Sequence, residues 1–319
     1  MFPMNKQALR ADALLLLTAC IWGFAFVAQR SGMEYMGPFT FNGIRFLLGG
    51  FSLVPIVLLR RAARGGNAQK PPAFRVLLGS SLLAGICLFL GASLQQVGII
   101  YTTAGNSGFI TGLYVIFTPI FAIFLGRKTR LPTWIGAALT LAGLFFLSAA
   151  PRVFGGAAPP GSLAVNIGDL ITAAGALFWA FHVLVIDSLV RRVDAVALSS
   201  GQFFCCGLLS LVIAFFTETI VPGQIAAGLI PILYGGVCSA GVGYTLQVVA
   251  QKNAPPAHAT ILLSLEGTFA AIGGVLILSE PLGAWTLLGF ALMLSGMLAT
   301  QWDLIMGGRR PGAKRPGLT

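Results

Sequence analysis

The sequence predicts an all-α membrane protein in which ten transmembrane helices form two inverted five-helix repeats. The first observation is composition: 56% of the 319 residues are hydrophobic and only 9% are charged, whereas soluble domains are typically about 25% charged. The second is a succession of apolar runs, most of them close to the roughly 20 residues that a spanning helix needs. The third is a similarity between the two halves of the chain.

The apolar runs follow one another along the whole chain and leave no long soluble segment between them. We expect spans at 13–31, 37–59, 75–97, 103–125, 132–150, 168–189, 195–216, 227–250, 257–279 and 283–302. Every cysteine falls inside an apolar run, which argues against a disulfide framework. The stretch Leu17–Cys20 has the shape of a lipoprotein cleavage site, but the apolar run continues beyond it to Ala28, so we assign it to the first span.

The basic residues predict the orientation of these spans. Short cytoplasmic loops of membrane proteins are enriched in Lys and Arg. With both termini in the cytoplasm, the outer segments hold only Arg30 and Arg152, and Arg45 lies inside a span. All other basic residues of the chain then fall in the inner segments, so we expect cytoplasmic termini and a location in the bacterial inner membrane.

The two halves of the chain, 1–152 and 153–319, resemble each other. Offsets of 152 to 157 residues superpose Trp22 on Trp179, Phe46 on Phe203, Cys87-x3-Gly91-x3-Gln95 on Ser239-x3-Gly243-x3-Gln247, and Gly136 and Gly143 on Gly289 and Gly296. Each half holds five spans, and because five is odd, the second half must be inverted relative to the first. Many secondary transporters have this architecture, with the substrate site near the midplane where the halves meet.

The same residues resemble a known family, the EamA type of the drug/metabolite transporter (DMT) superfamily, over almost the whole chain. The first half carries Trp22-Gly23, GIRF at 43–46, and GFITGLYVIFTPIFAIFLGRK at 108–128. The second half carries LFWAF at 177–181, Gln202, and AQKNAPPAHATILLSLEGTFAAIGGVLILSEPL at 250–282. Two positions depart from the family pattern, because Gly267 stands where many members have Pro and Arg127 where many have Glu.

This resemblance implies ten helices around a central cavity and export without ATP. Members of the family are similar to exporters of amino acids and other metabolites, so amino acids are the expected substrate class. The expected partners are a small-molecule substrate and the lipid bilayer, not nucleic acid. A monomer could suffice, because two such halves already enclose a cavity.

Glu266 is the leading candidate for a functional residue. It lies about 15 Å into the ninth span at 1.5 Å per residue, near the midplane of a hydrocarbon core about 30 Å thick. Ionisable residues at this depth are costly and usually functional. Its counterpart in the first half is Leu113 or Tyr114, and Tyr114 is also a candidate for the cavity wall. Glu266 either couples transport to protons, binds a substrate amine, or tethers the ninth helix to a neighbour.

Arg45 lies about 12 Å into the second span by the same rise. It could bind a substrate carboxylate, pair with Glu266, or link two helices structurally. Its side chain could also extend toward the nearer interface. A partner is expected in every case, since an unpaired Arg at this depth would be expensive.

The aromatic candidates are Trp22, Trp179 and His182. Trp179 and His182 are spaced for one helix face, and the two tryptophans lie near mid-span, away from the interfacial belt where Trp usually gathers. They could line a cavity for an aromatic or amphipathic solute, or they could pack between helices. For His182, a hydrogen bond between helices competes with a role as a proton relay.

Three further polar residues complete the set of candidates. Gln95 and Gln247 end matching ridges of small residues, which allow close helix contact; they are either a pair of polar gate residues or members of interhelical hydrogen bonds. Asn106 precedes the fourth span much as Pro255 and Pro256 precede the ninth. A helix N-terminus at such a position could hold a carboxylate if it opened into the cavity, and would be an ordinary cap at the surface.

The leading functional hypothesis is therefore a secondary transporter that works by alternating access and exports small amphipathic metabolites. An exporter of drug-like or nucleoside solutes, a channel and a lipid scramblase remain alternatives. An enzyme is not expected: the chain has only two histidines, no HExxH and no pair of aspartates in facing spans. A P-loop is also missing from the sequence, and we expect no metal or cofactor.

Overall fold

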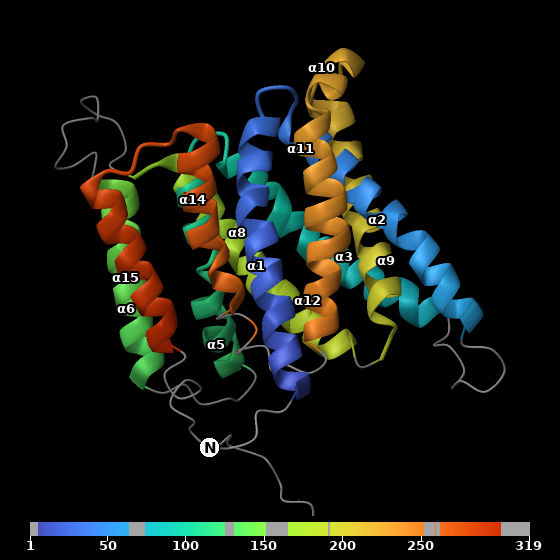
Figure 1. Ribbon diagram of the computed structural model, residues 1–319, viewed down its shortest axis with the longest axis horizontal. Coiled ribbons are helices and arrows are strands. Elements are labelled where there is room, and N and C mark those ends of the chain that lie inside the picture. Colours follow the sequence, from blue (N-terminus) through green and yellow to red (C-terminus); the bar gives the residue numbers. More distant parts are fainter. Residues whose placement is uncertain are drawn as a thin grey trace, which may run out of the picture.

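The computed structural model is built from helices and contains no strand in the residues that it describes, which are 6–63, 74–124, 131–150, 165–190, 192–251, 259 and 262–300. Figure 1 shows the helices standing side by side in one bundle. The elements are α1 Lys6–Gly32, α2 Pro38–Ala63, α3 Phe74–Gly98, α4 Ala104–Thr111, α5 Tyr114–Phe124, α6 Leu131–Leu144, π-helix η1 Phe145–Ala149, α8 Ile167–Leu189, α9 Ala195–Thr217, α10 Pro222–Ala227, α11 Leu229–Leu233, π-helix η2 Tyr234–Tyr244, α12 Thr245–Ala250, α14 Glu266–Leu278 and α15 Ala284–Thr300.

Within the described ranges, six helical segments are long and apolar enough to cross a membrane: Arg10–Gly32, Pro38–Arg60, Phe74–Gly98, Ile167–Leu189, Ala195–Thr217 and Leu229–Ala250. They coincide with six of the predicted spans. Shorter apolar helices occupy Trp134–Leu147, Leu262–Leu278 and Ala284–Ala299, inside three of the other predicted spans. The chain is therefore a helical membrane protein. The stretch Leu17–Cys20 lies within α1, and all five cysteines are free thiols.

The outer surface of the bundle is apolar, as expected for helices in lipid. Phe124, Phe215 and Ile230 have exposed fractions of 82%, 74% and 81%. Hydrophobic side chains of this size would be a liability in water when gathered in large patches. Polar side chains such as Asn42, Gln96 and others are instead buried between the helices, so the polarity pattern is that of a membrane bundle.

The fourth predicted span is not the continuous helix that we expected. It is divided into α4 and α5 by a turn at Gly112 and Leu113. At this turn Leu113 N donates to Ile110 O (3.0 Å) and Val115 N donates to Gly112 O (3.0 Å), which is the i→i+3 pattern of a tighter helix. Gly112 favours this interruption of the α-helix, because glycine is destabilising in a helix interior.

A similar turn interrupts the ninth predicted span. Residues 262–264 are helical, Leu265 forms a turn in which its N–H donates to Leu262 O (3.3 Å), and α14 begins at Glu266. Tyr114 and Glu266 are thus the first residues of the helices that follow the two turns. Short segments of this tighter geometry inside a helix often mark functional hinges.

The eighth predicted span is continuous, but its middle is a π-helix. Element η2 has eleven residues between α11 and α12, and π-helical segments of any length are rare and concentrate at functional sites. This segment faces the centre of the molecule, where Gly243 contacts the Trp22 ring and Ser239 O accepts a hydrogen bond from Trp22 Nε1 (3.3 Å).

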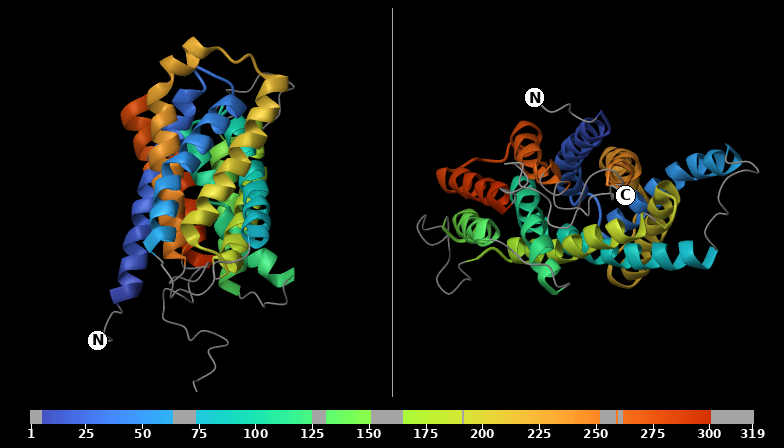
Figure 2. Two further views of the ribbon diagram at one scale, coloured as in Figure 1. Left: turned by 90° about the vertical axis from the view of Figure 1, so that its right-hand side faces the viewer. Right: turned by 90° about the horizontal axis from the view of Figure 1, so that it is seen from below.

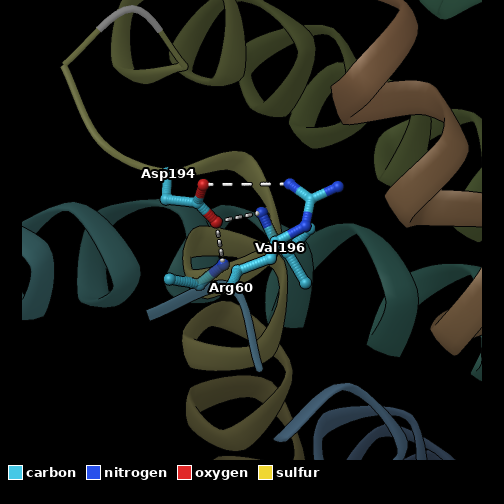
Figure 3. A network of polar contacts seen from close by, with 4 residues as sticks. Arg60, Asp194 and Val196 are labelled. Atoms are coloured by element: carbon cyan, nitrogen blue, oxygen red, sulfur yellow. Dashed lines mark hydrogen bonds and ion pairs between the residues drawn. The ribbon is translucent and has the colours of Figure 1, made fainter. Parts of the chain in front are cut away.

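Helices α2 and α9 form an antiparallel pair that is linked at both ends. At one end the Glu218 carboxylate, which follows α9, accepts hydrogen bonds from Phe39 N (2.7 Å) and Thr40 N (2.8 Å) at the start of α2. At the other end Asp194 caps α9 and lies 3.9 Å from Arg60 near the end of α2 (Figure 3). The two helices therefore run in opposite directions across the bundle.

Helices α6 and α15 are also antiparallel and pack through small residues. A side chain at Gly289 would meet Gly143 O at 2.9 Å, and one at Gly296 would meet Gly136 O at 2.6 Å. Glycine lets the two backbones approach this closely. Seen from below in Figure 2, this pair stands at one edge of the molecule, while α2 and α3 reach the opposite edge.

Candidate functional site

A small cavity lies at the centre of the bundle, between α1, α2, α3, α4, α5, α8, η2, α12 and α14. Its volume is about 30 Å³, which is room for one or two water molecules. All the predicted site residues except Asn106 line it: Trp22, Arg45, Gln95, Tyr114, Trp179, His182, Gln247 and Glu266. Side chains from both halves of the sequence therefore meet at one place.

Asn106 lies elsewhere, beside a different hollow near the start of α4. Its backbone N–H donates to Thr103 Oγ1 (3.0 Å), and Glu280 accepts from Ala104 N (2.6 Å) and Gly105 N (3.1 Å). The N-terminus of α4 does hold a carboxylate, as we considered possible, but it is the chain's own Glu280. Pro255 and Pro256 lie outside the described residues.

Glu266 and Tyr114 face the cavity from the two interrupted spans. Their exposed fractions are only 3% and 4%. Tyr114 lies close enough for its hydroxyl to interact electrostatically with the Glu266 carboxyl. Even so, Glu266 Oε1 and Tyr114 Oη have no well-formed hydrogen bond within the part of the chain that the structure describes. Buried polar atoms with so few partners are rare in proteins. Apart from their contact with each other, the two groups are therefore candidate contacts for a ligand.

Arg45 is fully buried, with an exposed fraction of 1%. Its Nε donates to Asn42 Oδ1 (2.9 Å), and its guanidinium carbon lies 4.5 Å from the centre of the Phe46 ring. These contacts are the partners that we expected, but they are neutral. Among the described residues the ion pair with Glu266 that we considered does not form, and Arg45 Nη2 has no hydrogen bond.

Aromatic rings form one wall of the cavity around Tyr244. The centre of its ring lies 4.5 Å from that of Trp22 and 6.0 Å from that of Trp179. His182 and Phe203 also stand against it, at 6.3 and 5.5 Å. Each tryptophan both packs on a glycine of the facing helix and lines the cavity: Trp179 covers Gly91, as Trp22 covers Gly243.

The two glutamines that terminate the small-residue ridges differ in their contacts. Gln95 takes part in several hydrogen bonds: its Oε1 accepts from Trp179 Nε1 (2.9 Å) and Thr111 Oγ1 (3.4 Å), and its Nε2 donates to Gln29 Oε1 (2.9 Å). Gln247 Oε1 has no such partner in the described part of the chain. Gln95 therefore connects helices, whereas Gln247 leaves an acceptor facing the cavity.

His182 makes the interhelical hydrogen bond that was one of its two interpretations. Its Nε2 lies 2.8 Å from Gln202 Oε1. Because the amide oxygen can only accept, Nε2 must carry a proton. The bond joins α8 to α9 directly behind the aromatic wall.

The sequence analysis missed Gln29 and Tyr244 as cavity residues. Gln29 could have been found, because Trp22, Ala25, Phe26 and Gln29 recur at i, i+3, i+4 and i+7 along one helix face, and all of them line the cavity. Tyr244 could also have been found, because it lies three residues before Gln247 and both line the cavity. It follows Ser239 by five residues, a spacing that does not share a face in an α-helix but does in a π-helix.

The site combines one buried cation, one buried carboxyl, neutral hydrogen-bonding atoms and an aromatic wall. Nothing in it resembles a nucleophile with its base, and the described residues hold no group of three or more His, Cys, Asp or Glu that could bind a metal ion. Its chemistry is that of reversible, noncovalent binding.

Comparison with known proteins gives a consistent result. The EamA-like transporter family matches this chain twice, over residues 9–149 and 166–301. The family and the similar proteins below are transporters, not enzymes.

Among relatives, an "Uncharacterized transporter" of Archaeoglobus fulgidus is 30% identical over 298 residues, covering 92% of this chain and 86% of that protein. The "Uncharacterized inner membrane transporter YedA" of Escherichia coli K12 is 26% identical, covering 91% of each chain. A solved crystal structure with 18% identity has a TM-score of 0.64 and covers 94% of this chain and 99% of that one, so the two share a fold.

Proposed function

Because this chain belongs to the EamA-like transporter family of the DMT superfamily, we propose that it is a secondary transporter of the inner membrane. It exports small amphipathic metabolites, above all amino acids, by alternating access. The observation that carries this proposal is the small central cavity, in which buried polar groups from both halves of the chain meet beside two interrupted helices.

The proposal includes two inverted five-helix repeats, with the boundary between the halves near residues 152 and 153. The double match of the family supports a repeat. The antiparallel pairs α2–α9 and α6–α15 support the inversion, because each joins a helix to its counterpart at an offset of about 153 to 157 residues. The packing between the halves also supports the repeat. Helix α8 is the counterpart of α1, and η2 lies in the counterpart of α3. Each half places its first helix against the third helix of the other half, because α1 packs on η2 and α8 packs on α3.

Alternating access is supported by the interrupted helices. Discontinuous helices near the bilayer midplane form the binding sites of many secondary transporters. The cavity of about 30 Å³ is far smaller than the roughly 300–1,000 Å³ of a typical small-molecule pocket. The bundle must therefore rearrange before a metabolite can enter, and the turns before Tyr114 and Glu266 are the natural positions for this change.

The orientation of the protein follows from the distribution of its basic residues. In the proposed topology both termini are cytoplasmic, and the Glu218 end of the α2–α9 pair faces outward. The relative YedA is named an inner membrane transporter, which supports the location. Many of the basic loop residues lie outside the described residues, so this argument rests on the sequence.

Proton coupling through Glu266 is part of the proposal. The residue has the depth and burial of a protonatable coupling group. The sequence also lacks the P-loop of an ATP-driven pump. A proton that binds to Glu266 on one side of the membrane and leaves on the other would link solute flux to the proton gradient.

Counterflow in proteoliposomes tests the proposal. Vesicles are loaded with unlabelled amino acids, nucleosides or quaternary amines, and uptake of the labelled solute is followed. Saturable exchange of amino acids is the expected result. Exchange confined to nucleosides or drug-like cations would make these solutes, not amino acids, the substrate class. Flux that neither saturates nor responds to a solute gradient would identify a channel or a scramblase instead of a carrier.

A further inference from the structure

We infer that the cavity binds its substrate as a zwitterion, with the anionic group at Arg45 and the protonated amine at Glu266. This inference rests on the proposed transport function and adds the polarity of the bound solute. It is carried by the atoms that the folded chain leaves without partners, which divide into a cationic end and an acidic end.

The cationic end is the Arg45 guanidinium. Its contacts are the Asn42 amide oxygen and the faces of Phe46 and Phe41, the latter at 5.6 Å. None of these groups carries a negative charge, and Nη2 remains without a hydrogen bond. An Arg at this depth is costly unless an anion compensates it. A carboxylate matches the two parallel N–H donors of a guanidinium, as a phosphate also does, and the carboxylate is the anionic group of an amino acid.

The acidic end surrounds Glu266. Its Oε1 makes no geometrically well-formed hydrogen bond within the described segments, and neither does Gln247 Oε1. The Tyr114 hydroxyl lies beside the Glu266 carboxyl. All three oxygens can accept a hydrogen bond. A protonated amine offers three N–H donors and no acceptor, so it is the group that matches this set. All three residues line the same cavity as Arg45.

The Arg45 guanidinium and the Glu266 carboxyl do not compensate each other's charge. Arg45 and Glu266 form no ion pair within 4.0 Å in the described structure. Tyr244 lines the same cavity as these two residues. A solute with only one charge would compensate one end and leave the other buried and uncompensated. A zwitterion compensates both ends, and its side chain meets the rings of Trp22, Trp179 and Tyr244.

Binding to purified protein in nanodiscs tests the inference without measuring transport. Each of three amino acids (leucine, methionine and phenylalanine) is compared with its decarboxylated amine and with its deaminated acid. Binding is followed by the fluorescence of the cavity tryptophans and by ligand-dependent thermal stability. One hydrogen bond to a charged group corresponds to about a 10- to 100-fold change in Kd. At least one zwitterion should bind tighter than both of its analogues by this factor.

Two substitutions then assign the ends. Arg45→Gln should reduce the affinity for the zwitterion to that for its decarboxylated amine, and should leave the affinity for the amine unchanged. Glu266→Gln should reduce the affinity for the zwitterion to that for its deaminated acid, and should leave the affinity for the acid unchanged. Arg30→Gln and Glu34→Gln remove the same charges from residues outside the cavity and should leave the ranking intact. A purely structural role would instead weaken all ligands together.

The inference is overturned if no zwitterion binds better than its analogues, or if the two substitutions alter all three ligand types equally. The wild-type comparison decides the matter even if a variant fails to fold. Failure here is distinguishable from failure of the proposed function. Saturable counterflow of nucleosides or cations, with no preference for zwitterions, would leave a carrier in place and remove only its proposed substrate polarity.

Discussion

Replacing Gly23 by alanine should destabilise the protein and impair transport. Gly23 lies on α1 where this helix crosses the start of α14. A Cβ atom at this position would lie 2.8 Å from Glu266 O and 2.9 Å from Ala270 N, and it would overlap Phe269 Cβ. The nearest obstacles are backbone atoms and a Cβ, which cannot rotate away, so the two helices would have to separate.

The size of the effect follows from these distances. Ordinary contacts between heavy atoms lie at about 3.5–4.0 Å, so the helices must move apart by roughly 0.7 Å or more. Overpacking of this kind typically costs about 1–3 kcal/mol. Alanine also favours a helix over glycine by about 0.5–1 kcal/mol. The expected net loss for Gly23→Ala is therefore up to about 2.5 kcal/mol, together with displacement of Glu266.

Gly79 provides the matched control. It lies in α3 with no neighbouring atom within 4 Å of an added Cβ, so Gly79→Ala should gain the helix preference without a clash. The difference in unfolding free energy between the two variants isolates the clash, at about 1–3 kcal/mol. It can be measured by thermal unfolding in nanodiscs, with counterflow as the functional assay. Equal melting temperatures and equal flux for the two variants would refute the close contact between α1 and α14.

Three further predictions concern the site and its supports. Glu280→Gln should weaken the cap at Ala104 N and Gly105 N and lower the free energy of unfolding by about 0.5–2 kcal/mol. Glu34→Gln, which removes an exposed carboxylate, is the control. Equal unfolding free energies of the two variants would contradict the cap. Trp179→Phe keeps a ring but removes the donor to Gln95 Oε1, so counterflow should fall about 2- to 13-fold while protein yield stays unchanged; unaltered counterflow would show that the bond is dispensable. Glu266→Gln should abolish pH-driven flux. Because it also removes the proposed ligand of the substrate amine, it should raise the solute concentration that half-saturates exchange about 10- to 100-fold. An unchanged pH dependence would exclude the coupling role.

Six of the ten predicted spans are confirmed, in the described part of the chain, as helices long and apolar enough to cross a membrane, because bilayer thickness fixes the length of an apolar helix. The sequence did not predict the turn at Leu265 or the one at Leu113. No proline stands at either turn, and glycine occurs only at the first. The turns instead depend on tertiary contacts, such as the close approach of Gly23 to Glu266 O and of Gly267 to the Phe109 backbone. Such contacts join residues from distant parts of the chain.

The candidate site was predicted in part for a simple physical reason. Polar groups are costly in lipid, so Arg45, Gln247 and Glu266 stand out within apolar runs, and the structure places all three at one cavity. The lack of an ion pair between Arg45 and Glu266 could not be foreseen, because depth along a span does not fix the direction of a side chain. The π-helix brings Ser239 and Tyr244, five residues apart, to the same cavity, which an α-helical pattern does not predict.

The most direct test of the account is counterflow before and after thiol modification of a Ser239→Cys variant without the five native cysteines. Ser239 lines the cavity and is buried, with an exposed fraction of 2%. The account predicts saturable counterflow, its loss when this cysteine is modified, and protection by the transported solute. Flux that continues unchanged after complete modification would show that the solute does not pass through this cavity, and would contradict the proposed mechanism.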